Sequence, residues 1–203
     1  MSRAPPPPIC HAITDLVGGG GSNFTTAFFY TGPEDDIRKK IMADPSFAAP
    51  EVQLRDVLTP ACDVWALGCV LHHVFSNDRL WMPLAGHRNS LVDLTLCFGK
   101  LPDPWWSAWP GRGRFFNSSG CIKHSMVSAV PTCLSISQRI ATVRGHREAV
   151  HGMGGEEYRW FQHMLHAIFH LLPAERASIH AAMRYLPPRW LDEVEREETG
   201  AGR

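Results

Sequence analysis

The chain has no excess of charge of either sign. Its 203 residues include 20 Lys and Arg and 20 Asp and Glu, which gives a formal net charge of zero. A broad surface for nucleic acid or for an anionic membrane normally needs a basic excess, so the composition argues against both partners. With 44% hydrophobic and 20% charged residues, the sequence is typical of one globular domain with a sizeable core.

Other signals are also missing. The six cysteines form no Cys-x-x-Cys pair, so we expect free thiols in a reducing compartment and no disulfide framework. The first residues lack the apolar stretch of a secretory signal. The longest apolar stretches, around 64–75 and 161–172, contain histidines and are too short to cross a bilayer. We therefore expect an intracellular protein, cytoplasmic or nuclear.

The N-terminal region is rich in proline and glycine. Pro5–Pro8 favours an extended polyproline conformation, and Gly18–Gly21 is typical of a flexible linker. The glycines do not match a phosphate-binding loop, because no Lys-Ser/Thr follows them and the G-x-G-x-x-G spacing is not met. We predict that residues 1–22 form a flexible segment.

Helical periodicity dominates the remaining sequence. The predicted helices span 60–75, 90–98, 156–172 and 174–186, and a short one is expected within 134–150. Thr59 is the expected N-cap of the first helix, with Pro60 at its first position. That helix is apolar around most of its circumference, which predicts a central, buried position.

The sequence between the second and third of these helices predicts irregular structure. The prolines within 101–109 argue against a helix there, although three tryptophans of this stretch must pack on something. Residues 110–133 are rich in Gly, Ser and Pro and predict a long surface loop.

Three motifs follow one another along the chain. They are Ser46-Phe-Ala-Ala49-Pro50-Glu51, Asp63-Val-Trp65-Ala-Leu-Gly68 and Leu171-Leu-Pro-Ala-Glu-Arg176. In order, spacing and chemistry they resemble the eukaryotic protein kinases. The first resembles the end of the activation segment, the second the start of the buried helix of the C-terminal lobe, and the third the segment with a structural arginine. The Trp-rich segment 102–106 and the sequence after it are most similar to fungal kinases related to the SR-protein kinases.

The resemblance implies a mainly α fold, namely the helical C-terminal lobe of a protein-kinase-like fold without its N-lobe. It divides the chain into an activation-segment-like loop at 23–51, a helical domain at 52–191 with an insertion around 110–150, and a charged tail at 192–203. Glu51 and Arg176 are expected to form a buried ion pair. Asp63 is expected to hold the catalytic loop, or simply to favour the helix N-terminus through the dipole.

The residues that carry phosphoryl transfer in the family are not matched. Active kinases use a Gly-rich loop, a strand lysine, His-Arg-Asp…Asn and Asp-Phe-Gly. The best match to the last is Asn23-Phe24-Thr25, where an amide replaces the metal-binding carboxylate. Another register places Asp15 there. Asp44 stands where kinases usually carry threonine.

We therefore expect no catalytic, cofactor-binding or metal-binding residue in this chain, although the family uses ATP and Mg²⁺. The predicted function is that of an inactive, pseudokinase-like interaction module. Two alternatives stay open: part of an active Ser/Thr kinase whose N-lobe is missing from this sequence, or a fragment without function. Family helices that would cover the 60–75 helix are missing, so a protein partner is expected to cover that face.

Two further candidates come from the residues alone. His163, His166 and His170 share one helical face with a spacing that could bind zinc, or they could lie beside the apolar stripe with their tips in water. The possible phosphorylation sites Thr25, Thr26, Tyr30 and Thr31 precede the cations Arg38, Lys39 and Lys40.

Overall fold

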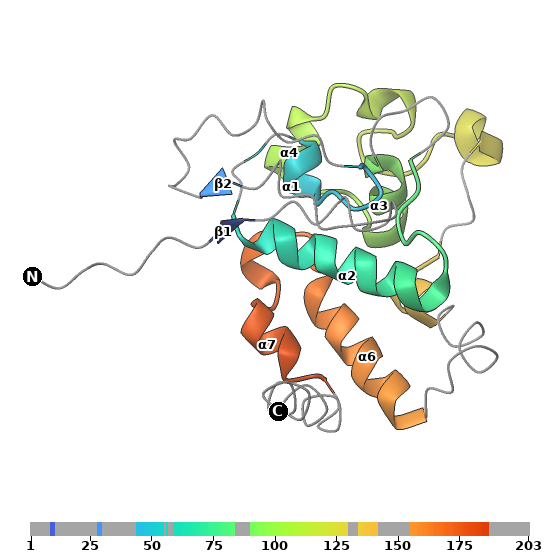
Figure 1. Cartoon of the computed structure of the whole chain (residues 1–203). Helices are drawn as coiled ribbons and strands as arrows, with labels where there is room; N and C mark the ends of the chain where they lie inside the picture. Colours follow the sequence, from blue (N-terminus) through green and yellow to red (C-terminus); the bar gives the residue numbers. More distant parts are fainter. Residues whose placement is uncertain are drawn as a thin grey trace, which may run out of the picture.

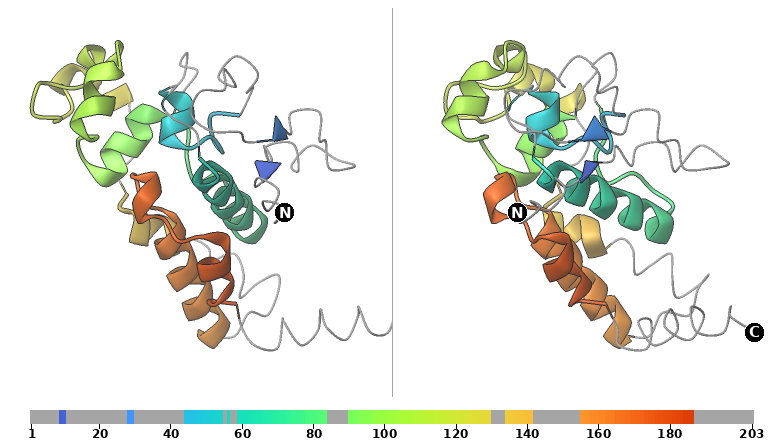
Figure 2. Two further views of the ribbon diagram at one scale, coloured as in Figure 1. Left: turned by 90° about the vertical axis from the view of Figure 1, so that its left-hand side faces the viewer. Right: turned by 60° about the vertical axis from the view of Figure 1, so that its left-hand side comes forward.

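The computed structural model describes residues 9–10, 28–29, 44–54, 56, 59–83, 90–129, 134–141 and 155–186. The fold is mainly helical, as predicted (Figure 1). Helix α2 crosses the middle of the molecule between an upper group (α1, α3 and α4) and a lower pair (α6 and α7). The two turned views in Figure 2 show the same arrangement.

The elements follow in the order β1 (Ile9–Cys10), β2 (Phe28–Phe29), α1 (Pro50–Gln53), α2 (Ala61–Ser76), α3 (Leu91–Phe98), α4 (Asp103–Ala108), η4 (Arg112–Arg114), η5 (His124–Ala129), α6 (Gly155–Ile168), η6 (Pro173–Glu175) and α7 (Ile179–Met183). Residues 136–141 are also helical. The strands β1 and β2 pair antiparallel, with Ile9 opposite Phe29 and Cys10 opposite Phe28. Ile9–Cys10 therefore forms a strand within the segment that was expected to be flexible.

The start of α2 differs from its prediction. Its N-cap is Pro60, which makes no side-chain capping bond, and the Thr59 hydroxyl oxygen is buried without a hydrogen-bond partner. The predicted Thr59 cap is wrong, because the Thr59 hydroxyl accepts no backbone N–H at the start of the helix. The helix ends at Asn77, whose φ of 56° and backbone N–H bond to the His73 carbonyl form a left-handed cap.

Helix α2 is buried on one side. Val64, Trp65 and Cys69 are at most 8% exposed, while Val74 near the other end is 60% exposed. The prediction of a helix buried nearly all round is therefore correct only for the side that faces the core.

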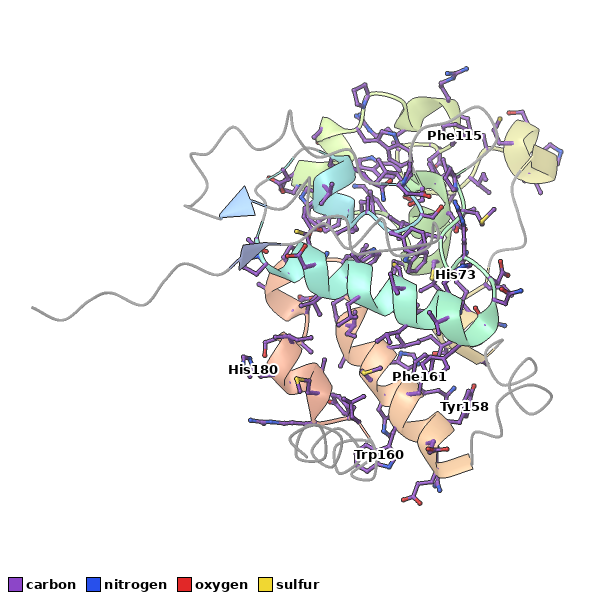
Figure 3. The ribbon with its side chains drawn as sticks, in the orientation of Figure 1. His73, Phe115, Tyr158, Trp160, Phe161 and His180 are labelled. Atoms are coloured by element: carbon purple, nitrogen blue, oxygen red, sulfur yellow. The ribbon has the colours of Figure 1, made fainter. Side chains whose placement is uncertain are left out.

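An aromatic stack on α2 forms the centre of the core. The Trp65 ring lies on Trp81 with centroids 5.4 Å apart, and the edge of Phe169 approaches Trp65 at 5.1 Å. Phe161, labelled in Figure 3, extends from α6 toward α2, where its ring meets Phe75 at 4.6 Å. These pairs join α2 to the lower helices through large apolar surfaces.

Gly68 permits α2 and α6 to approach closely. A Cβ atom at this position would lie 2.7 Å from Ile168 Cγ2 and 2.9 Å from Phe169 Cζ. Real carbon contacts of this kind do not occur, so no larger residue fits without movement of the C-terminal end of α6.

Residues 101–129 are more ordered than predicted. The expectation that prolines exclude a helix is wrong: Pro102 is the N-cap of α4 and Pro104 stands in its first turn, where the missing N–H is harmless. The expected long loop contains η4, η5 and a bridge between Phe116 and Ile122. Phe115 and Phe116 are buried against Trp106 and Trp109 and form an aromatic cluster (Figure 3).

The last two predicted helices are shorter than expected. Helix α6 ends at Ile168 rather than at 172, and Pro173 begins the 3₁₀ turn η6 instead of ending a helix. Helix α7 then begins only after Ser178, whose hydroxyl accepts a bond from the Ala181 backbone N–H. The irregular stretch between them leaves backbone carbonyls free to bind Arg176.

Candidate functional site

The candidate site is the buried junction around Glu51 and Arg176. Ala49 is extended and Pro50 begins α1, so Glu51 falls in the first turn of this short helix. Both side chains of the pair are fully buried. The expected ion pair is present: Arg176 Nη1 donates to Glu51 Oε1 at 2.5 Å, and Nη2 donates to Oε2 at 2.7 Å.

The remaining donors of Arg176 bind backbone carbonyls. Nη1 also donates to Ala61 O at 3.1 Å and Nη2 to Leu171 O at 2.9 Å. Nε donates to His170 O at 2.9 Å. These contacts use all five N–H donors of a guanidinium. A buried charge with every donor bound holds three segments in one geometry, namely α1, the start of α2 and the turn after α6.

Arg176 also packs on the motif tryptophan. Its Cζ atom lies 4.8 Å from the centroid of the Trp65 ring, a cation–π contact in a desolvated place. Trp65 is fully buried, and its indole N–H has no hydrogen-bond partner. The three motifs thus meet at one point, through Glu51, Trp65 and Arg176. The wider role of Ala49, Pro50 and Gly68 as kinase motif residues stays a prediction.

Asp44 stabilises the turn that precedes α1. Asp44 Oδ1 accepts the Ser46 backbone N–H at 2.9 Å, and Oδ2 lies 3.2 Å from Arg79 Nη1. Arg79 also donates to the Ser46 hydroxyl at 3.0 Å and lies over the Phe47 ring at 5.8 Å. The Asp44 carboxylate therefore holds the turn together through both of its oxygens.

A second polar network ties α1 to the start of α3. Gln53 Nε2 donates to the Ala48 carbonyl at 2.7 Å, and Gln53 Oε1 accepts the Ser90 backbone N–H at 2.7 Å. The Ser90 hydroxyl donates to Pro45 O at 3.0 Å. The whole segment 44–54 is thereby fixed against the helical core.

Asp63 lies in the first turn of α2 and is half-buried. The Cys62 thiol is 3.9 Å from its Oδ1 atom. That Asp63 holds a catalytic loop stays a prediction, since the chain before residue 28 is described only at Ile9–Cys10.

Several predicted positions lie outside the described residues. They are Asp15, Asn23, Phe24, Thr25, Thr26, Tyr30, Thr31, Arg38, Lys39 and Lys40. In the part of the chain that the structure describes, no three His, Cys, Asp or Glu side chains are grouped so that they could hold a metal ion.

His163 and His166 of α6 and His170, which follows the end of that helix, are not grouped as a metal site. His163 and His170 are exposed and His166 is half-buried. Burial lowers the pKa of His166, and the neighbouring His163 and His170 lower it further, because a positive charge at one disfavours protonation of the next. Cys69 and Cys121 are free thiols. Burial raises the pKa of the Cys69 thiol, which makes it an inert core residue.

A second buried ion pair was missed by sequence reasoning. Arg139 Nη2 lies 2.6 Å from Asp93 Oδ1, and Nη1 donates to Asp93 Oδ2 at 2.9 Å and to Leu80 O at 2.8 Å. Its Cζ atom lies 5.3 Å from the centroid of Trp81. The partners are 46 residues apart, and no local pattern marks either of them.

Comparisons with known proteins point to one class. No family model matches the chain. It is 22% identical over 155 residues to the dual specificity protein kinase lkh1 of Schizosaccharomyces pombe, a match that covers 74% of this chain and 21% of that kinase. It superposes on the crystal structure of the kinase domain of PF14_0431 with a TM-score of 0.53 and 18% identity, over 80% of this chain and 45% of that domain.

The chain therefore has the fold of a helical, C-lobe-like part of a kinase domain, and its sequence is similar to that of a protein kinase. It spans about a fifth of the matched kinase and less than half of the matched domain. No described helix is both long and apolar enough to cross a membrane.

Proposed function

We propose that this chain is a protein-kinase-family fragment that acts as an inactive, pseudokinase-like interaction module. One observation carries the proposal. The segment 44–54 is fixed to the core through Glu51 and Gln53, while Asp44, which stands where kinases usually carry threonine, is bound to Arg79 and Ser46. This arrangement supports an interaction module, because a segment fixed in this way offers a stable surface, whereas phosphoryl transfer needs a base and metal ligands that the sequence does not match.

The subfamily belongs to the same proposal. We place the chain near fungal kinases related to the SR-protein kinases. The Trp-rich segment that suggested this placement is a structural unit: Trp105 donates to Asp56 from α4, and Trp106 packs in the aromatic cluster. The similarity to a fission yeast kinase supports a fungal relationship.

The interaction surface that we propose is the outer face of α2. Val74 is 60% exposed, and Leu67, Val70 and Leu71 are half-buried. A protein partner that covers this face would remove apolar surface from water, which favours association. Nucleic acid and membrane are not proposed as partners, and we propose an intracellular location, as expected for a kinase.

The first test is thermal unfolding of the purified chain with and without Mg²⁺-ATP. We expect no shift of the midpoint, because a ligand that does not bind the folded state cannot stabilise it. A kinase with a complete nucleotide site, treated in the same way, is the control and should shift upward. An upward shift for this chain, together with transfer of radiolabelled phosphate to a protein substrate, would contradict an inactive module.

A second candidate is part of an active Ser/Thr kinase whose N-lobe lies outside this sequence. The small share of each matched kinase that the chain covers favours it. Transcript sequencing and mass spectrometry of the native protein separate the two. Peptides with a Gly-rich loop and a strand lysine, joined to this chain, would support the active kinase.

A further inference from the structure

Residues 100–124 combine an aromatic core with a basic exterior. The segment contains four lysine and arginine residues, Lys100, Arg112, Arg114 and Lys123, but only one acidic residue, Asp103. The whole chain has no net charge, so this local excess is a property of the segment. Neither the kinase-like motifs nor the α2 face use these side chains.

The aromatic core holds the basic residues in place. Trp106 and Trp109 meet edge to face at 6.1 Å, and Phe116 lies 5.8 Å from Trp106. Arg112 donates to the Trp109 carbonyl at 2.9 Å, which fixes the backbone turn after α4. The cations therefore project from a packed unit.

Contacts within the segment tie Lys100, Arg112 and Lys123 to one packed unit, and Arg114 follows Gly113 in the chain. Lys100 Nζ and Arg112 Cζ lie 5.8 Å and 6.0 Å from the centroid of one ring, that of Trp106. Lys123 donates to the carbonyl of Gly113, the residue between Arg112 and Arg114. A Cβ atom at Gly120 would lie 2.7 Å from Lys100 Cβ, so the turn that leads to Lys123 packs directly on Lys100.

These cations are poorly neutralised. Asp103 pairs with Lys100 at 2.9 Å, on a side chain that is 81% exposed. Among the described residues, no carboxylate lies within 4.0 Å of Arg112, Arg114 or Lys123. Four cations against one carboxylate leave a local positive charge, which an anionic ligand would neutralise.

We infer that this basic surface docks an acidic segment of a partner protein. Four cations are few for nucleic acid, which usually engages a longer basic stripe. A membrane site also needs exposed apolar side chains, and near this surface Val127 is the one large hydrophobic residue, among those described, that is strongly exposed. The inference is independent of the proposed function, since such a surface can serve an active or an inactive kinase.

The test measures binding of a fluorescein-labelled peptide of eight glutamates to the full chain by anisotropy at low ionic strength. The variant R114Q/K123Q removes two exposed cations from the surface. We expect its affinity to fall about tenfold, because each exposed ion pair contributes a modest amount. The control R159Q/R184Q makes the same change of charge on α6 and α7, at exposed positions, and should bind as the wild type does.

Further measurements identify the class of partner and check that the variants are folded. Thermal unfolding of each variant checks the fold, and K100Q removes a cation without touching the bond of Lys123 to Gly113. If R114Q/K123Q and K100Q bind the peptide more weakly and the control R159Q/R184Q does not, the inference is supported. Any of three results would overturn it. They are an equal loss of peptide affinity in both double variants, no peptide binding by the wild type, or tighter binding of a single-stranded oligonucleotide or of phosphatidylserine vesicles than of the peptide.

Discussion

Arg176 shows how much one side chain can organise. It binds both oxygens of Glu51 and three backbone carbonyls, and it packs on Trp65. Lysine cannot replace it, because an ammonium has three donors on a flexible stem and cannot form a planar two-point contact. The pair is a structural device whose loss leaves a buried charge without a partner.

For this pair we predict that Glu51→Gln and Arg176→Met each lower the free energy of unfolding by about 3–5 kcal/mol. The double variant E51Q/R176M should be less destabilised than the sum of the two, because it leaves neither charge unpaired. Urea unfolding of all four proteins measures the coupling. Strictly additive losses would show that the two side chains act independently.

His72 makes stability depend on pH. Burial lowers its pKa below the ordinary value, while its Nε2 lies 3.3 Å from the Arg139 carbonyl and Nδ1 lies 3.2 Å from the Ser76 hydroxyl. The unfolded chain therefore takes up the proton first. Stability from neutral His72 is complete above the unfolded-state pKa of about 6.5 and is lost as the pH falls from there through the lower folded-state value.

We accordingly predict that the wild type is more stable than His72→Gln at pH 7.5 and that this advantage shrinks at pH 5. Urea unfolding at both pH values measures it. The exposed His180, labelled in Figure 3, provides the control variant His180→Gln, which should change the free energy of unfolding little because the side chain lies outside the core. A His72→Gln difference that is equal at both pH values would contradict the assignment.

At the scale of elements, the close crossing of α2 and α6 depends on Gly68, which has no side chain. We predict that Gly68→Ala lowers the free energy of unfolding by about 1–3 kcal/mol, because overpacking against Ile168 exceeds the gain of up to about 1 kcal/mol in helix propensity. Gly155→Ala, at the open start of α6, is the control and should be neutral or stabilising.

Thermal and urea unfolding test this prediction. Truncation of Ile168 removes the Cγ2 atom that lies 2.7 Å from the added methyl group. The double variant G68A/I168A should therefore be more stable than additivity predicts. Equal effects of Gly68→Ala and Gly155→Ala would show that the close approach of the helices is not the limiting contact.

The sequence allowed some elements to be predicted and not others. Helix α2 and the Glu51–Arg176 pair could be predicted because periodicity and the spaced motifs both point to them. Helix α4 was missed because its prolines were taken as breakers, although Pro102 is its N-cap and Pro104 occupies the tolerated first turn. Arg79 and Arg139 were missed because their partners, Asp44 and Asp93, are brought close only by tertiary folding.

For the whole molecule we expect limited stability in isolation. The apolar residues on the outer face of α2, with Val74 60% exposed, contribute less burial than a covered helix would. We predict a thermal midpoint no higher than about 50 °C, in the lower part of the range for mesophilic domains. Calorimetry measures it, and cooperative unfolding well above that temperature would contradict the expectation.

A variant on the outer face of α2 tests whether that face is exposed in the isolated chain. Val74→Gln should change the midpoint little in the isolated chain, because exposed substitutions usually stay within about 0.5 kcal/mol. A large drop would mean that other parts of the chain already cover Val74, and that no partner is needed there.

The junction of Glu51 and Arg176 also sets an order of events during synthesis. The two residues are 125 positions apart, so the carboxylate leaves the ribosome long before its arginine is made. At about 5–20 residues per second, that interval is on the order of ten seconds. During this time α1 has no partner charge that would allow Glu51 to be buried. The segment 44–54 can therefore take its final place only after nearly all of the helical core has been translated.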